Sequence, residues 1–264
     1  MPKSSLEEIL AVTRARVVAL QGSAADLERR AAAAPAPLPF PALPGSGTVG
    51  VVAEVKRRSP SQGTIHADLD SVAHARAYVR GGAVAVSVLT DEAHFGGSLH
   101  DLAAVAGAVA VPVLRKDFIL DELQVLEARA AGASAVLLIV RALTPARLTA
   151  LAGFARGQGL ATLVEVHAAG ELEAALAAEP TAVGVNARDL ATFELDRDAA
   201  ARVLARVPPD MPAVAESGVE SRADVERLGA LGADFVLVGT RVARERDPEA
   251  TVRALVGVSR RARG

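Results

Sequence analysis

Residues 49–56 read VGVVAEVK, an apolar run that predicts a buried strand yet ends in Glu54 and Lys56. Side chains alternate between the two faces of a strand, so residues 54 and 56 point the same way. The chain then turns polar, since residues 57–63 read RRSPSQG. Charges beside a packed core are unfavourable unless they are paired or used in function. The run therefore predicts a strand whose polar end faces a functional cavity.

Runs of this kind recur along the rest of the chain. Seven more, each followed by a stretch of helical period, are AVAVSVLT (83–90), VPVLRKDF (111–118), SAVLLIV (134–140), ATLVEV (161–166), AVGVN (182–186), PAVAES (212–217) and DFVLVG (234–239). Nearly continuous apolar strands are typical of parallel sheets covered by helices. Eight βα units in about 210 residues match a closed barrel.

The predicted fold is thus α/β, a single (β/α)8 TIM barrel over residues 49–264. The alternative is an open doubly wound sheet, which the sequence favours less because no GxGxxG motif follows the first strand. Residues 1–48 are predicted to form an N-terminal extension. Residues 4–34 have helical spacing and a Ser-x-x-Glu start typical of a capping box, and the Pro-rich residues 35–47 cannot continue a helix or a central strand.

Composition excludes several classes of function. There is no cysteine, which rules out disulfides and thiolate chemistry. The net charge of −2 is made of interspersed signs, so no nucleic-acid partner is expected. The N-terminus lacks the apolar core of a signal peptide and no apolar run is long enough for a membrane span, so we expect a cytoplasmic enzyme or binding protein. The five histidines lie in unrelated segments, and no metal site is expected.

Polar residues end several of the predicted strands. Besides Glu54 and Lys56 they are Lys116, Glu165, Asn186 and Glu216. In a (β/α)8 barrel the carboxyl ends of the strands meet at one rim, where active sites lie. We therefore expect these side chains to gather at the mouth of the barrel.

At this point a family resemblance is clear. The segments AEVKRRSPSQG, SVLTDEAHFGGSLHDL, VLRKDFILDELQVLEARAAGASAVLLIV, LVEVH, VGVNARDLATFELD and VAESGV resemble, in order and spacing, the indole-3-glycerol phosphate synthases of tryptophan biosynthesis. The resemblance covers nearly all of residues 49–247. It implies a cofactor-free lyase that converts 1-(o-carboxyphenylamino)-1-deoxyribulose 5-phosphate into indole-3-glycerol phosphate, CO2 and water.

The same resemblance implies roles for the charged residues. Lys116 corresponds to the general acid that protonates the ketose oxygen, where an ammonium also stabilises the developing charge. Glu165 corresponds to the general base that removes a proton as the indole forms, and burial is expected to raise its pKa. The alternative for Glu165 is an ion pair with a neighbouring lysine. Lys56 corresponds to a second catalytic lysine, oriented by Glu54, that binds the substrate carboxylate or phosphate. Which lysine acts at which step stays open, and a plain ion pair between Lys116 and Asp117 is the alternative to the first role.

Four more polar residues match family positions in the site. Asn186 and Arg188 correspond to contacts near the substrate ring and carboxylate, and the planar guanidinium suits a carboxylate. Glu216 corresponds to a site residue that binds a substrate hydroxyl or partners a lysine, and Ser217 lies beside it. Asp189 is expected to hold the loop together rather than to touch substrate.

The phosphate site is expected at the loops after the seventh and eighth strands, where main-chain N–H groups face an anion. The candidates there are Gly218, Gly239 and Thr240, with Ser59 reaching across from the RSPS segment. Glycine permits a close approach of the main chain.

Apolar walls for the anthranilate ring are expected from Phe95 and from Leu137 with Leu138. His94, Gln62 and Arg241 depart from the family pattern. We expect the ring of His94 to be exposed, Gln62 to weaken a phosphate contact, and Arg241 either to strengthen phosphate binding or to point into solvent.

Two alternative functions stay open. One is another sugar-phosphate enzyme on the same fold, either an aldolase using Lys116 as a Schiff base or a phosphoribosylanthranilate isomerase. The isomerase uses a cysteine base, which this chain lacks. The other is a silent barrel kept as a binding subunit, which the costly rim charges argue against. The expected partner is a small sugar-phosphate substrate, and the expected state is a monomer or weak homo-oligomer.

Overall fold

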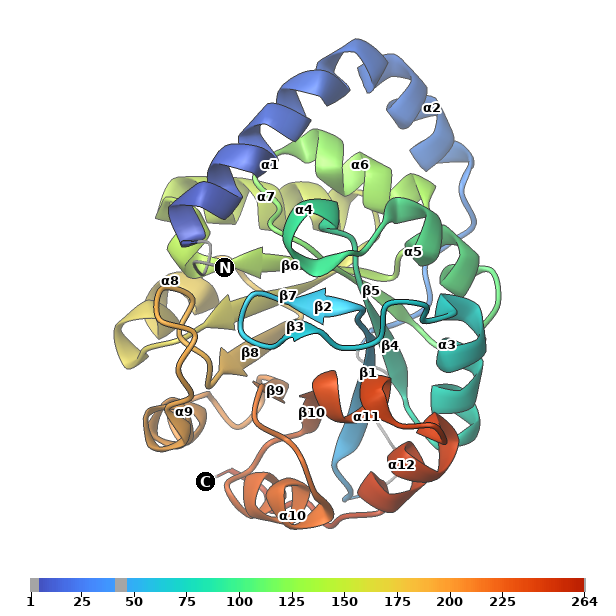
Figure 1. The fold of residues 1–264 in the computed structure, drawn as a ribbon. Helices are drawn as coiled ribbons and strands as arrows, with labels where there is room; N and C mark the ends of the chain where they lie inside the picture. The colour runs from blue at the N-terminus through green and yellow to red at the C-terminus, as the bar shows by residue number, and fades with distance from the viewer. Residues whose placement is uncertain (1–4, 41–46, 264) are drawn as a thin grey trace.

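The computed structural model describes residues 5–40 and 47–263. Its centre is a closed parallel barrel in which β1 pairs with both β10 and β4 (Figure 1). The barrel strands are β1 (Gly50–Val55), β4 (Ala85–Leu89), β5 (Val113–Lys116), β6 (Ala135–Ile139), β7 (Ala161–Val166), β8 (Ala182–Asn186), β9 (Ala213–Glu216) and β10 (Phe235–Val238). Closure confirms the predicted barrel and excludes the open sheet.

Helices surround the barrel on its outside (Figure 1). The longer ones are α3 (Ser71–Arg80), α5 (Leu99–Ala106), α6 (Glu122–Ala130), α7 (Pro145–Gly157), α8 (Leu172–Ala177), α9 (Arg197–Leu204), α10 (Arg222–Ala230) and α12 (Pro248–Leu255). Short turns in the loops are α4 (Glu92–Phe95), η2 (Val140–Ala142), η3 (Ala169–Glu171) and α11 (Thr240–Arg244). Side-chain caps start several helices; Asp70, for example, accepts the main-chain N–H groups of Val72 and Ala73 at 3.0 Å.

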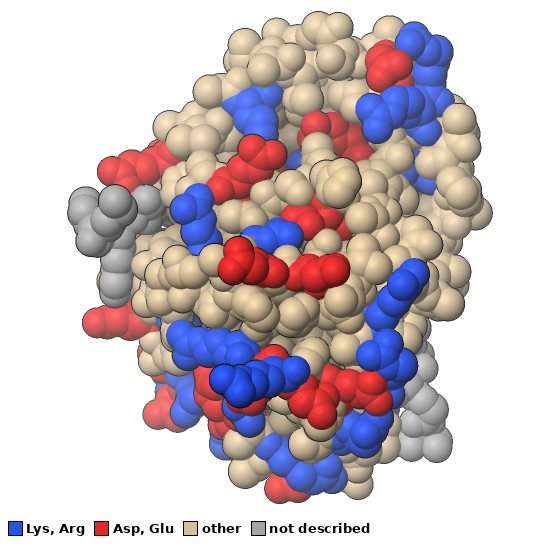
Figure 2. Space-filling model, turned by 45° about the vertical axis from the view of Figure 1, so that its right-hand side comes forward, with Lys and Arg blue, Asp and Glu red and all other residues tan. Residues whose placement is uncertain are grey.

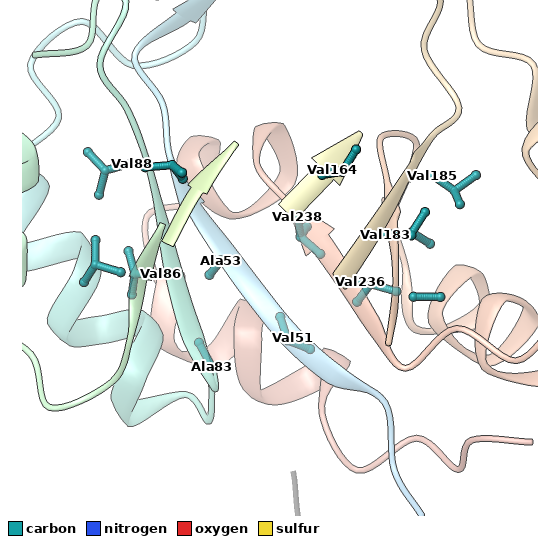
Figure 3. Packing of buried hydrophobic residues seen from close by; sticks show 14 of the residues in the cluster. Val51, Ala53, Ala83, Val86, Val88, Val164, Val183, Val185, Val236 and Val238 are labelled. Atoms are coloured by element: carbon teal, nitrogen blue, oxygen red, sulfur yellow. The ribbon is translucent and has the colours of Figure 1, made fainter. Parts of the chain in front are cut away.

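Strand alternation divides the core into two layers. Val51 and Ala53 point outward and pack with other small aliphatic residues against the helices (Figure 3). Leu114 and Leu163 belong to the inner layer, which fills the barrel. Lys116 and Glu165 follow these two leucines by two residues, so they point inward at the top of the same strands. The polar rim is therefore a continuation of the inner layer.

The N-terminal extension packs against the barrel as two helices, α1 (Leu6–Leu20) and α2 (Ala24–Ala33). The predicted capping box is confirmed, since the Ser5 N–H donates to Glu8 Oε2 at 2.7 Å and Ser5 Oγ accepts the Glu8 N–H. The predicted helical stretch is interrupted by a 3-10 turn, η1 (Gln21–Ser23). Helix α2 packs against α6, and α1 also contacts it (Figure 1).

The extension shares buried contacts with the barrel. Ile9 and Leu10 of α1 are buried in the inner cluster that also contains Leu114. Arg16 Nη2 donates to Asp117 Oδ1 at 2.7 Å, and Asp117 is fully buried beside the end of β5. Helix α1 is thus held at the strand end that carries the candidate acid.

A small hairpin follows β1. Its strands are β2 (Arg58–Ser59) and β3 (Gly63–Thr64), paired antiparallel, and it crosses in front of the barrel strands (Figure 1). The sequence interpretation did not predict these strands, because two-residue strands leave no periodic signal. The hairpin brings Ser59 over the barrel mouth.

Basic and acidic side chains are interspersed on the face shown in Figure 2. No single-sign surface dominates that view. Within residues 5–40 and 47–263 no helix is long and apolar enough to cross a membrane.

Candidate active site

The carboxyl ends of the strands surround a pocket of about 990 Å³, its open mouth included. Apart from Leu138, every site residue predicted from the sequence lines it, namely Glu54, Lys56, Ser59, Phe95, Lys116, Leu137, Glu165, Asn186, Arg188, Glu216, Ser217, Gly218, Gly239 and Thr240. These residues come from all eight barrel strands or the loops after them. The barrel therefore brings these fourteen residues together in one cavity.

Lys116 lies between two carboxyl groups on the pocket floor. Its Nζ is 3.4 Å from Glu165 Oε2 and 3.4 Å from Glu216 Oε2. The alternative partner, Asp117, instead pairs with Arg115 and Arg16. Burial alone would lower the pKa of Lys116, but the charges of Glu165, Glu216 and Glu54 outweigh it and raise that pKa. Lys116 is therefore a stable ammonium inside the cavity.

Glu165 is ionised, contrary to the expectation that burial raises its pKa. Burial does act in that direction, but Lys116 and hydrogen bonds from His167 and Asn186 outweigh it, and the pKa is held well below its usual range. The sequence could not reveal this, because the result depends on which cations surround the carboxylate in the folded barrel. Glu165 is therefore in the deprotonated form that a general base requires.

The pKa of Glu216 is shifted in the direction opposite to that of Glu165. Burial, followed by the adjacent charge of Glu165, raises the pKa of Glu216 to about 8. At neutral pH Glu216 therefore holds a proton and is a hydrogen-bond donor. Two carboxyl groups in one pocket thus have different protonation states, the pattern that separates an acid from a base.

Glu216→Gln is expected to stabilise the fold increasingly as pH rises. The folded-state pKa of Glu216, about 8, lies above its ordinary value of 4.5. Between these pH values the unfolded state releases a proton that the native state keeps, so the native state loses stability as pH rises. The amide has no proton to lose. The gain in unfolding free energy over wild type should grow between pH 5.5 and 8.5 by at most about 1.4 kcal/mol per pH unit. Urea unfolding at the two pH values measures it, and a pH-independent difference would contradict the assignment.

Glu54 and Lys56 form the second charged group, as expected from their shared face. Lys56 Nζ lies 2.8 Å from Glu54 Oε1, and Ser87 Oγ donates to Glu54 Oε2 at 3.4 Å. Gly239 makes room for the pair, since a Cβ there would clash with Glu54 Oε1 and lie 2.7 Å from Lys56 Nζ. Gly184 does the same for Glu216, whose Oε1 a Cβ would overlap. At both positions glycine leaves room for the polar side chains beside it.

The loop after β8 presents Arg188 to the pocket. Asn186 Oδ1 accepts the Arg188 N–H at 3.0 Å, and Arg188 Nη1 donates to Phe193 O at 2.8 Å. Burial lowers the pKa of Arg188, and the charge of Glu220 opposes this effect. As expected, Asp189 holds the loop, accepting the main-chain N–H of Ala191 at 2.8 Å. The remaining guanidinium donors of Arg188 suit a carboxylate.

Apolar residues form another wall of the pocket. The rings of Phe95 and Phe118 lie 6.2 Å apart, and Leu137 lies nearby in the inner layer. The expectation for Leu138 is wrong, because strand alternation turns it outward into the layer beneath the helices. Such a wall is suited to an aromatic ring.

The opposite wall is lined with small and hydroxyl residues. Ser59 Oγ lies 3.3 Å from Ser61 Oγ in the hairpin, facing the loops after β9 and β10. Ser217 has φ 67°, a left-handed conformation that is strained for a residue with a side chain and that recurs at functional sites. The adjacent Gly218, with φ 77°, adopts it without strain.

The three departures from the family pattern are paired. Gln62 Oε1 accepts from Arg244 Nη2 at 2.5 Å, which ties the hairpin to α11. Arg241 pairs with Glu245 and does not line the pocket. The expectation that His94 is exposed is wrong: its side chain is 11% exposed because it packs against Asp91, which caps α4.

Sequence reasoning missed several residues of the site. Asp91, Phe118 and Glu220 line the pocket, and His167 contacts Glu165 from behind. Phe118 lies in the LRKDF segment, two residues after Lys116, and His167 lies in LVEVH, two residues after Glu165. Their spacing from these two residues could have indicated that they lie near the site. No described group of three or more His, Cys, Asp or Glu residues is arranged to hold a metal ion.

Comparison with known proteins gives the family. The model of the family described as indole-3-glycerol phosphate synthase matches residues 6–255. The chain belongs to the indole-3-glycerol phosphate synthase family. The match begins within α1, so the family pattern includes the N-terminal extension as well as the barrel.

Individual relatives agree with the family assignment. The indole-3-glycerol phosphate synthase of Mycobacterium avium is 46% identical over 257 residues, covering 97% of this chain and 94% of that protein. Indole-3-glycerol phosphate synthase 2 of Streptomyces coelicolor is 50% identical over 233 residues, covering 88% and 90%. Among solved structures, tryptophan synthase from Mycobacterium tuberculosis is similar with a TM-score of 0.61 at 17% identity, covering 79% of this chain and 92% of that one. This last likeness concerns the fold.

Proposed function

We propose that the protein acts as an indole-3-glycerol phosphate synthase in tryptophan biosynthesis. The substrate is 1-(o-carboxyphenylamino)-1-deoxyribulose 5-phosphate, and the products are indole-3-glycerol phosphate, CO2 and water. The observation that carries the proposal is the pocket floor, where an ammonium, Lys116, lies 3.4 Å from an ionised and from a protonated carboxyl group.

The two walls of the pocket give the substrate its orientation. The anthranilate ring lies against Phe95 and Leu137, and its carboxylate accepts hydrogen bonds from Arg188. The phosphate lies at the opposite wall, bound by Ser59 and Thr240 and by the main chain at Gly218 and Gly239. This placement puts the ketose carbon over the pocket floor.

Ring closure joins the ring carbon that bears the carboxylate to the ketose carbon. As this bond forms, the ketose oxygen takes a proton from Lys116, whose charge also stabilises the developing alkoxide. The bond to the carboxylate then breaks, CO2 leaves, and its electron pair restores the aromatic ring. The carboxylate of Glu165 keeps Lys116 charged until the oxygen approaches.

Dehydration completes the reaction. The hydroxyl formed in the first step leaves as water with a proton from one of the two ammonium groups, Lys56 or Lys116. Glu165 removes the proton from the neighbouring carbon, and the double bond of the indole forms. Glu216, as a protonated donor, binds a substrate hydroxyl during these steps.

Three further expectations stay predictions. They are the division of the chain at residue 48, a monomeric or weakly associating state, and a cytoplasmic location.

The contact between Arg16 and Asp117 supports a functional role for the extension, since it reaches the residue beside Lys116.

Product analysis with a chelator present tests the proposal. Equal amounts of CO2 and indole-3-glycerol phosphate are expected from the carboxyphenylamino substrate, with no adduct on the protein after borohydride reduction. A reduced adduct at Lys116 would favour the aldolase. An isomerised sugar without CO2 would favour the isomerase, and substrate binding without turnover would favour a silent barrel.

A further inference from the structure

A histidine lies behind the candidate base, outside the pocket lining. His167 follows the end of β7, its side chain is 2% exposed, and its Nε2 lies 3.2 Å from Glu165 Oε1. Among the described residues neither ring nitrogen makes a hydrogen bond, so Nε2 is a buried donor with Glu165 Oε1 within reach. Glu165 is thus the acceptor nearest to Nε2.

The two oxygens of Glu165 face different partners. Oε1 faces the His167 ring, whereas Oε2 faces Lys116 Nζ at 3.4 Å. A carboxylate held at one oxygen cannot turn about its terminal bond without losing that contact. The ring therefore fixes which oxygen points at the reacting atoms.

A second carboxylate lies on the other side of the imidazole. The main-chain N–H of His167 donates to Glu171 Oε2 at 2.7 Å, and the ring Nδ1 lies 3.9 Å from the same oxygen. Glu171 ends the short turn η3. The imidazole is therefore placed between Glu165 and Glu171.

An arginine connects this arrangement to the next loop. Arg141 Nε donates to Glu171 Oε1 at 2.5 Å, and Arg141 Nη1 donates to Asp189 Oδ2 at 2.6 Å. Asp189 holds the loop that carries Arg188. The contacts thus run from the base to the loop that binds the substrate carboxylate.

We propose that His167 is a positioning residue, whose Nε2–H donates to Glu165 Oε1 and keeps Oε2 turned toward Lys116 and the substrate. The proposal rests on the proposed function, because Glu165 acts there as the base. His167 itself touches no reacting atom. Hydrogen bonds to a charged group are among the stronger ones in proteins.

The charges around Glu165 agree with this role. Lys116 from β5, Asn186 from β8, Glu216 from β9 and His167 are the groups that face it. The hydrogen bond and charge of His167 help to lower the pKa of Glu165, after Lys116. Loss of the imidazole is therefore expected to raise that pKa, so that the base becomes protonated at a higher pH.

Two substitutions test the donor. His167→Leu keeps a buried side chain of similar size without a donor, whereas His167→Gln places an amide N–H near the position of Nε2. We expect His167→Leu to lower kcat by about 10- to 100-fold, the range for a hydrogen bond to a charged group. KM should stay nearly constant, and the acid limb of the kcat profile should move to higher pH. His167→Gln should restore most of kcat, and His100→Leu, at an exposed position on α5, serves as the control.

A second measurement is independent of turnover. With glutamate labelled by ¹³C at the side-chain carboxyl, and the Glu165 signal assigned by its loss in Glu165→Gln, the midpoint of Glu165 titration should rise in His167→Leu. An unchanged midpoint, or a His167→Gln variant as slow as His167→Leu, would overturn the role of His167. An inactive wild type with the midpoint shift intact would instead refute the proposed function alone.

Discussion

Lys116→Met lowers kcat by about a hundred- to ten-thousand-fold, the usual contribution of a placed general acid. Methionine keeps the apolar stem within the inner layer of the barrel but has no proton and no charge. The ketose oxygen then develops negative charge with neither a donor nor a cation beside it. Single-turnover kinetics at saturating substrate measures the loss.

The variant Lys116→Arg tests the positive charge at this position separately from proton donation. The guanidinium keeps a cation between Glu165 and Glu216 but does not release its proton at working pH. We expect this variant to bind substrate and to stay slow. Thermal unfolding of both variants verifies that the fold is intact. A kcat within tenfold of wild type for Lys116→Met would remove Lys116 from the role of acid.

Glu165→Gln is expected to separate the two halves of the reaction. Ring closure and CO2 loss use Lys116, whereas the final proton removal needs a carboxylate that the amide cannot replace. With substrate labelled in the carboxyl group, rapid quenching should show CO2 released before indole absorbance appears. Formation of the indole should slow by about a hundred- to ten-thousand-fold.

The matched control is Glu173→Gln, an exposed position on α8, which should leave both steps unchanged. If Glu165→Gln slows CO2 release and indole formation equally, with no decarboxylated species accumulating, Glu165 is not confined to the second half. The role assigned to the base would then be wrong.

The barrel was predictable because each of its strands is an apolar run that is followed by a stretch with the periodicity of a helix. Alternation within the strands also placed Lys116 and Glu165 on the inner face. Leu138 was assigned to the wrong face, since SAVLLIV is apolar throughout and its phase is not visible in the sequence. The hairpin of β2 and β3 is too short to leave a pattern.

The electrostatics of the site could not be predicted in the same way. Glu165 and Glu216 both end strands and look alike in the sequence, yet one is ionised and the other protonated. The difference arises from their neighbours across the barrel, which only the closed fold brings together. The contact of Arg16 with Asp117, between residues far apart in the chain, is of the same kind.

The most direct test of the account is indole fluorescence after the carboxyphenylamino-deoxyribulose phosphate is added to the purified protein in chelator-treated buffer. The chain contains no tryptophan, so its own emission does not mask the product. We predict a rise in the wild type that is absent on the same timescale in Lys116→Met. A folded wild type that gives no rise, or an equal rise in both proteins, would contradict the central claim.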